Sequence, residues 1–239
     1  MAKDAKSAFC EDSRVKFPTL MHLMGMGFKY VSLKGLKTKY VEAPKTEFYP
    51  LTNILTDYFT DAYCTLNPKA EKKDAEDMLV KIQKSLQNDD LGRQFYNEIL
   101  LNTGERIIDL SSPANFYRNN TFQVTTEMTC GSKDSDNYRP DITIFVNGLP
   151  LAFIEVKKEN NHKGIQAETD RMKQRFVNPQ YRRFLNITQI MVFSNDMEYD
   201  NNEVTPTIGA FYATIGKKNT KYNCFREEGQ DSFPTARHI

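Results

Sequence analysis

Residues 139 to 160, RPDITIFVNGLPLAFIEVKKEN, decide the fold that the sequence predicts. They hold two runs of Ile, Val, Phe, Leu and Ala joined by NGLP, a pattern that is typical of a β-hairpin. Apolar residues fall on both faces of each run, so we expect two central strands with both faces covered. Three charged residues, Asp141, Glu155 and Lys157, lie at the ends of these runs. Burying an unpaired charge is costly, so their presence needs an explanation.

The geometry of the turn decides whether these three side chains meet. A two-residue turn at Asn147 and Gly148 would place Asp141 on the sheet face opposite Glu155. A three-residue loop ending at Gly148, in the left-handed conformation, would pair Asp141 with Phe153 and place it on the face of the other two charged residues. We predict the three-residue loop, because a two-residue turn without a compensating bulge would separate the three residues.

Two carboxylates and a lysine on one face have the parts needed for metal-assisted hydrolysis. Asp141 and Glu155 would repel each other unless a cation neutralised the pair. Magnesium prefers one or two carboxylates together with water and phosphate oxygens. Lys157 could then stabilise the charge that grows on a phosphate in the transition state. The same three residues could also form a salt-bridged surface cluster that needs no metal, and spacing alone leaves this alternative open.

The rest of the chain predicts an α/β protein with a mixed sheet and helices packed on it. Helical spacing of apolar residues predicts helices in the segments SRVKFPTLMHLMG, LTNILTDYFTDAYCTLNP, DAEDMLVKIQKSL and GRQFYNEILLN, so the first hundred residues are expected to be mostly helical. After Gly104, short β-rich runs predict strands at RIIDL, NTFQVTTEMT, DITIFV, LAFIEVK, ITQIMVFS and GAFYATI. KGIQAETDRMKQRF, between the fourth and fifth runs, predicts another helix.

Composition excludes several classes of protein. The 239 residues contain four widely spaced Cys and three His without ligand-like spacing, so a zinc site and a disulfide framework are not expected. The net charge of +1 gives no global cationic field for nucleic acid. No apolar run is long enough to cross a membrane, and the first residues, MAKDAKSAFCEDS, lack the apolar region of a secretory signal. We therefore expect a soluble cytoplasmic protein.

The string RPDITIFVNGLPLAFIEVKK resembles the nuclease motif of the restriction (R) subunit of type I restriction-modification enzymes, within the PD-(D/E)xK nuclease superfamily. Pro140 and Asp141 match the PD element, and residues 155–157 match ExK. The FVNGLPL turn is also similar, and the order of the surrounding elements extends the resemblance over most of residues 10–215. The resemblance implies a PD-(D/E)xK core, a mixed sheet flanked by helices, with a helical amino-terminal portion.

The resemblance also implies roles for single residues. Asp141 and Glu155 would bind Mg²⁺, and Lys157 would be the catalytic lysine of a type I site-specific deoxyribonuclease. Glu11 matches a further acidic residue that some members add to the metal site, although a solvated glutamate at a helix start would look the same. Members often carry a Gln and a Tyr on the helix after ExK, and here Met172 and Phe176 take those places.

Length and motifs set the expected domains and partners. We expect a helical portion over residues 1–104, the nuclease core over 105–218, and a tail or linker over 219–239. A complete R subunit would continue into an ATP-driven DNA motor, but no G-x-x-x-x-G-K-[ST] phosphate loop occurs in this chain, so ATP would be bound elsewhere in the full-length subunit. The implied partners are double-stranded DNA and the modification and specificity subunits.

Four arginines are candidates for contacts to DNA phosphates: Arg171, Arg175, Arg182 and Arg183. Arg171 and Arg175 lie one helical turn apart, although they could equally form a solvated face paired with Glu168 and Asp170.

Two other functions remain open: a stand-alone PD-(D/E)xK nuclease of repair or recombination, and a noncatalytic docking module that keeps the fold. A scaffold has no physical need for a repulsive pair of carboxylates, which argues against the docking module.

Overall fold

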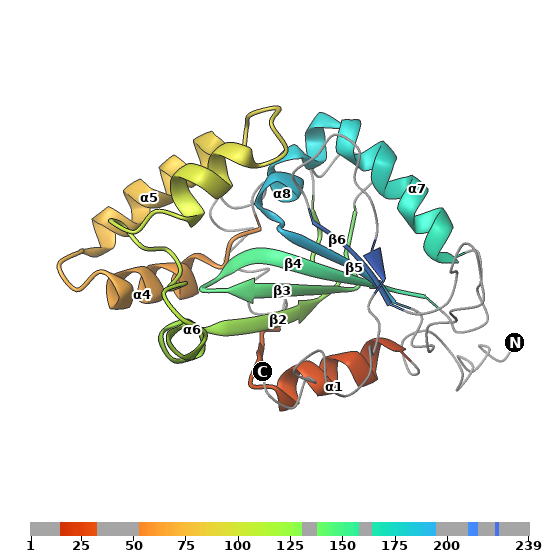
Figure 1. Ribbon diagram of the computed structural model, residues 1–239, viewed down its shortest axis with the longest axis horizontal. Coiled ribbons are helices and arrows are strands. Elements are labelled where there is room, and N and C mark those ends of the chain that lie inside the picture. Colours follow the sequence, from red (N-terminus) through yellow and green to blue (C-terminus); the bar gives the residue numbers. More distant parts are fainter. Residues whose placement is uncertain are drawn as a thin grey trace, which may run out of the picture.

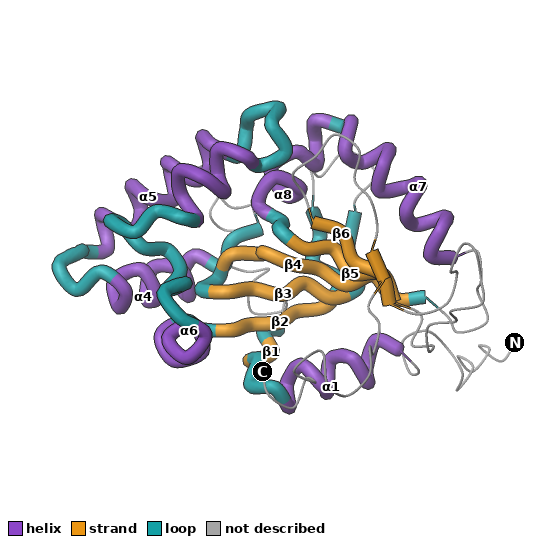
Figure 2. The backbone as a smooth tube through the Cα atoms, in the orientation of Figure 1, coloured by secondary structure: helices purple, strands orange, loops and turns teal. Residues whose placement is uncertain are grey.

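The computed structural model describes residues 15–32, 53–130, 138–157, 164–194, 210–214 and 223–224, and within them a mixed sheet lies between helices (Figures 1 and 2). Seven strands follow one another across the sheet in chain order: β1 (Lys29–Tyr30), β2 (Phe122–Thr126), β3 (Ile142–Val146), β4 (Leu149–Val156), β5 (Ile190–Ser194), β6 (Ala210–Thr214) and β7 (Asn223–Cys224). The pairs β1–β2 and β4–β5 are parallel, and the other pairs are antiparallel. The predicted α/β class with a mixed sheet is confirmed.

Helices cover both faces of the sheet. The helical elements are α1 (Phe17–Gly25), α4 (Thr56–Leu66), α5 (Lys72–Ser85), the π-helical turn η2 (Phe95–Leu100), α6 (Pro113–Asn119), α7 (Gly164–Val177), the 3-10 turn η3 (Pro179–Tyr181) and α8 (Arg182–Ile187). In Figure 1, α7 lies above the sheet and α1 below it. Phe153 packs with Met172 and Phe184 from the α7 and α8 side, whereas Ile154 packs with Leu20 of α1. Both faces of β4 are therefore buried, as its apolar sequence predicts.

Helices α4 and α5 pack against the turn end of the β3–β4 hairpin. Phe59 of α4 and Ile82 of α5 share one apolar cluster with Val146 and Leu149, the residues on either side of the turn. The helical portion and the sheet thus have a common core. Strands β1 and β7 also lie within the ranges 1–104 and 219–239 that were assigned to a helical portion and a tail, and the division into domains stays a prediction.

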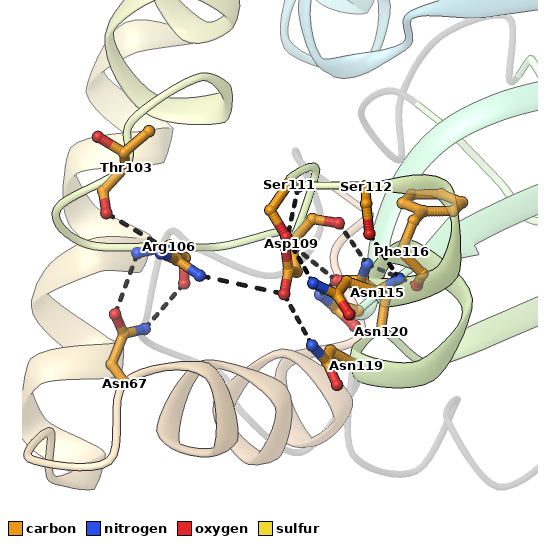
Figure 3. Close-up of polar contacts among 11 residues, drawn as sticks. Asn67, Thr103, Arg106, Asp109, Ser111, Ser112, Asn115, Phe116, Asn119 and Asn120 are labelled. Atoms are coloured by element: carbon orange, nitrogen blue, oxygen red, sulfur yellow. Dashed lines mark hydrogen bonds and ion pairs between the residues drawn. The ribbon is translucent and has the colours of Figure 1, made fainter.

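Most predicted elements are present, but RIIDL is not a strand. Ile107 and Ile108 are both buried, but the backbone N–H and C=O of Asp109 bond the Asn120 side chain and not a neighbouring strand. Figure 3 shows the reason: the Asp109 carboxylate accepts hydrogen bonds from Ser111 and from Asn119 of α6, and these bonds close the loop. The Ser111 and Asn119 bonds, in that order, lower the pKa of Asp109 to about 2. Helix α6 was not predicted. It begins after Ser112, whose side chain accepts a hydrogen bond from Asn115 N and caps the helix.

The hairpin turn differs from the predicted one. Asn147 and Gly148 form a two-residue turn with φ values of 52° and 75°, so the predicted three-residue loop is wrong. Strand β4 carries a compensating bulge: Phe145 pairs with Pro150, but Ile144 pairs with Ala152. Beyond the bulge the pairing continues to Ile142 and Ile154, and one further residue brings Asp141 opposite Glu155. The two carboxylates therefore share a face, as predicted, through a different register.

Side-chain contacts stabilise the left-handed backbone at Asn147. Its side-chain oxygen accepts from Thr121 N at 2.7 Å, and its side-chain nitrogen donates to Ile107 O at 2.9 Å. Asparagine tolerates positive φ better than most residues because its short polar side chain bonds locally. These bonds fix the turn against the loop that contains Asp109.

Gly148→Ala should destabilise the protein by roughly 2–4 kcal/mol, because alanine is strained at positive φ and the site has no room for it. A Cβ at this position would lie 2.4 Å from Leu55 O and 2.9 Å from Phe59 N, both backbone atoms. The measurement is the free energy of unfolding in urea. Gly25→Ala is the matched control, since nothing lies within 4 Å of its Cβ position. Equal stability of the two variants would show that the turn is not constrained in this way.

Candidate active site

The two predicted carboxylates lie side by side at the end of the hairpin that is remote from the turn. Glu155 is the penultimate residue of β4, and Asp141 immediately precedes β3. Asp141 Oδ2 accepts a hydrogen bond from Val156 N at 2.8 Å. This bond orients the Asp141 carboxylate against the backbone of β4, next to Glu155. Glu155 lies on the face that α7 covers, because it alternates with Val156, which packs on the α1 side. Asp141 is opposite Glu155 and shares this face.

Glu155 is buried without full compensation of its charge. Its exposed fraction is 5%, and no described group forms a hydrogen bond with its Oε1 atom. Burial and then the charge of Asp141 raise the pKa of Glu155 to about 8. The Tyr138 hydroxyl lowers this pKa, because its dipole favours the charged carboxylate, although the two groups do not form a hydrogen bond. A buried carboxylate of this kind favours either a proton or a cation.

Lys157 lies beside Glu155 on the same sheet face, so the structure brings the three predicted residues together. Its Nζ atom lies 3.9 Å from Glu155 Oε2 and donates to Val156 O at 3.0 Å. The side chain is only 13% exposed. An ammonium group held in a partly buried position next to a carboxylate pair is suited to stabilising a further negative charge.

A second lysine, Lys16, approaches the site from the start of α1. Its Nζ atom lies 4.0 Å from Asp141 Oδ1 and 2.8 Å from Glu127 Oε1, and its side chain is 9% exposed. Sequence analysis missed this residue. Lys16 is one of 32 basic residues, and Asp141 lies 125 positions further along the chain, so no local pattern distinguished it.

The arginines proposed to contact DNA do not form one cluster. Arg171 and Arg175 both bind Glu168, one of the two partners considered in the sequence, but Glu168 is buried and Asp170 pairs with Lys173. Arg182, at the start of α8, lies 4.0 Å from Asp89 Oδ2. Arg183 follows it and has a buried Nη1 atom without a hydrogen-bond partner among the described residues. Their binding of DNA stays a prediction.

The remaining predicted site residues are either packed in the core or not described. Met172 is fully buried and Phe176 partly buried in one apolar cluster, so both are core residues, although Met172 Sδ also accepts a hydrogen bond from Arg175. Glu11 lies outside the described residues. Within the described ranges, no group of three or more His, Cys, Asp or Glu side chains is placed to hold a metal ion. Any cation at this site would therefore have Asp141 and Glu155 as its described protein ligands, a number that magnesium accepts.

Comparison with known proteins identifies a family for this chain. Residues 9–204 match the family model described as "Type I restriction enzyme R protein N terminus", which covers most of the chain. No curated protein matches the chain significantly. In the part of the chain that the structure describes, no helix has the length and apolar character to cross a membrane.

Proposed function

Because the chain belongs to the family of type I restriction enzyme R protein N termini, we propose that it is a magnesium-dependent endonuclease region that hydrolyses phosphodiester bonds of double-stranded DNA. The observation that carries this proposal is the Oε1 atom of Glu155, which has no hydrogen-bond partner among the described residues and lies buried beside a second carboxylate and a lysine. A fold gains nothing from such a group unless the site binds something that compensates its charge.

The residues present fit magnesium. Asp141 and Glu155 would hold the ion through their carboxylate oxygens, and water and phosphate oxygens would complete its coordination. Bound magnesium supplies Lewis-acid polarisation of a phosphate oxygen and lowers the pKa of a bound water. The bond from Val156 N keeps the Asp141 carboxylate in a fixed orientation, so little reorganisation is needed on binding.

Lys157 would act on the substrate directly. Its ammonium group lies on the same face as both carboxylates and is largely shielded from bulk water. A positive charge in such an environment interacts more strongly with a developing negative charge than it would in water. Lys157 would therefore stabilise the scissile phosphate in the transition state and orient the attacking water.

The complete R protein would supply the other activities. We infer that an ATP-driven motor follows this region in the full-length subunit, and that the modification and specificity subunits recognise the DNA sequence. Cleavage by this region would then depend on assembly and on ATP, which the motor would bind.

Calorimetric titration of the chain with Mn²⁺, which occupies sites of the magnesium type, tests the metal site. We expect Asp141→Asn to weaken binding by at least about tenfold, because it removes one of two carboxylate ligands. Glu105→Gln, which changes an exposed carboxylate paired with Lys81, should bind like the parent. Metal-dependent cleavage of double-stranded DNA by the assembled enzyme tests the reaction. Equal Mn²⁺ affinity and equal cleavage for the parent and Asp141→Asn would refute the proposal.

A further inference from the structure

We propose that Glu168 is a positioning residue that holds the Lys157 ammonium group at the active site, and that Arg171 and Arg175 serve this site by holding Glu168. The inference rests on the proposed nuclease function. It assigns a role to a carboxylate on α7 that the sequence motif does not include, and it gives the two arginines a partner within the protein.

Glu168 is the most thoroughly paired carboxylate near the site. It is 2% exposed, although a glutamate at this depth is costly without partners. Its Oε1 atom accepts from Arg175 Nη1 at 2.8 Å, and its Oε2 atom accepts from Arg171 Nη1 at 2.9 Å. Lys157 Nζ lies 3.5 Å from the same Oε2 atom. Three cations therefore surround one carboxylate.

Arg175 is the anchored partner of Glu168, whereas Arg171, whose side chain is 58% exposed, contacts the carboxylate from the surface. Arg175 lies over the ring of Tyr138, with 4.0 Å between its guanidinium carbon and the ring centroid, and it also contacts Met172 Sδ. Tyr138 packs edge-on against Phe153 of β4. Arg175 is thus fixed between α7 and the sheet, and charge-assisted bonds of this kind have defined geometry. The Glu168 carboxylate that Lys157 approaches is consequently a fixed point and not a mobile surface group.

Lys157 needs a second anionic partner if Glu155 binds a cation. Its side chain has four rotatable bonds, and ordering it costs about 2 kcal/mol of rotamer entropy. Lys157 lies nearer to Glu168, at 3.5 Å, than to Glu155, at 3.9 Å. A metal ion on Glu155 would compete with Lys157 for that carboxylate, whereas Glu168 would stay available. Because two arginines already satisfy Glu168, Lys157 can keep one hydrogen directed towards a phosphate.

Glu168→Gln tests the inference, because the amide keeps the size of the side chain and removes its charge. The first readout is the rate at which an amine-reactive acylating reagent modifies Lys157 in the free chain, followed by mass spectrometry. We expect this rate to rise several-fold, because the ammonium group loses an anionic partner that restrains it. Lys16, held by Glu127 on the α1 side of the site, is the internal reference and should react at an unchanged rate. The control variant is Asp170→Asn, which changes an exposed α7 carboxylate paired with Lys173.

The second readout is DNA cleavage by the assembled enzyme. Glu168→Gln should lower kcat by about 10–100-fold, as is common when a partner of an active-site group is removed, with KM for DNA unchanged. If Glu168→Gln does not fold, Glu168→Asp replaces it. This variant keeps the charge but shortens the side chain by one methylene, and should show a smaller rise in labelling.

The outcomes separate this inference from the proposed function. If Lys157→Ala leaves cleavage intact, the proposed function fails, while the labelling rate still reports whether Glu168 restrains Lys157. If Lys157→Ala abolishes cleavage but Glu168→Gln behaves like Asp170→Asn in both readouts, the proposed function stands and the inference is overturned. A rise in labelling at Lys16 as large as at Lys157 would also overturn it, because it would indicate general loosening of the fold.

Discussion

Glu155→Gln is expected to reduce DNA cleavage by the assembled enzyme by roughly 10³-fold or more, equivalent to ~4 kcal/mol of transition-state stabilisation. The amide has the shape of the carboxylate but carries no charge, so it would bind a divalent cation poorly. It would also leave Asp141 as the single described carboxylate of the pair. The measurement is the rate at which covalently closed circular DNA is linearised in the presence of Mg²⁺ and ATP.

Two controls make this result specific. ATP hydrolysis by the assembled enzyme should be unchanged, because in the proposed assembly it would depend on the motor and not on Glu155. Glu98→Gln changes an exposed glutamate that accepts a hydrogen bond from Gln94 in the π-helical turn, and should cut DNA like the parent. If Glu155→Gln and Glu98→Gln cut DNA at the same rate, Glu155 is a structural residue and the active site lies elsewhere.

The same substitution should make the metal-free chain more stable at pH 8, by on the order of 3 kcal/mol. Burial and the neighbouring Asp141 raise the pKa of Glu155 from 4.5 to about 8. The folded chain therefore binds a proton at Glu155 over a pH range in which the unfolded chain has released it. The stability of the parent falls as pH rises through this window, whereas glutamine has no charge to bury.

Urea unfolding in EDTA at several pH values measures this difference. The free energies of unfolding of the parent and Glu155→Gln should be similar at pH 4, diverge between pH 4.5 and 8, and differ by a constant amount above that range. Glu98→Gln should give no such divergence. A parent that is as stable as Glu155→Gln at pH 8 would mean that the Glu155 carboxylate is well compensated in the folded chain. Opposite effects on cleavage and stability would mark Glu155 as a residue kept for chemistry.

The central hairpin and its three charged residues were predictable because their signals are local. Alternating and continuous apolar runs define β3 and β4, and a short polar turn joins them. The register was not predictable in the same way. The sequence indicates a turn at Asn147 and Gly148, but whether it has two or three residues depends on contacts made by Thr121 and Ile107. The two-residue turn and the bulge in β4 together place Asp141 opposite Glu155, so the two carboxylates meet although the predicted loop was wrong.

The partners of the site residues were hidden for a different reason. Lys16 and Asp141 come together only because α1 packs on the sheet, and sequence spacing carries no information about that contact. The spacing of Arg171 and Arg175 did predict one shared helix face. It did not show that both arginines bind one buried glutamate, because the same spacing occurs on solvated helices.

The two-residue turn and the bulge also constrain how chains of this family can vary in length. The turn is held by Leu55 of the helical portion, whose N–H donates to Gly148 O at 2.8 Å. Glu155 lies seven residues beyond Gly148, about 23 Å along an extended strand. If the turn keeps two residues, one residue inserted in β3 next to it would move Asp141 to the other face of the sheet unless the bulge were lost at the same time. Insertions and deletions at these two places should therefore be inherited together, even though neither place touches the active site.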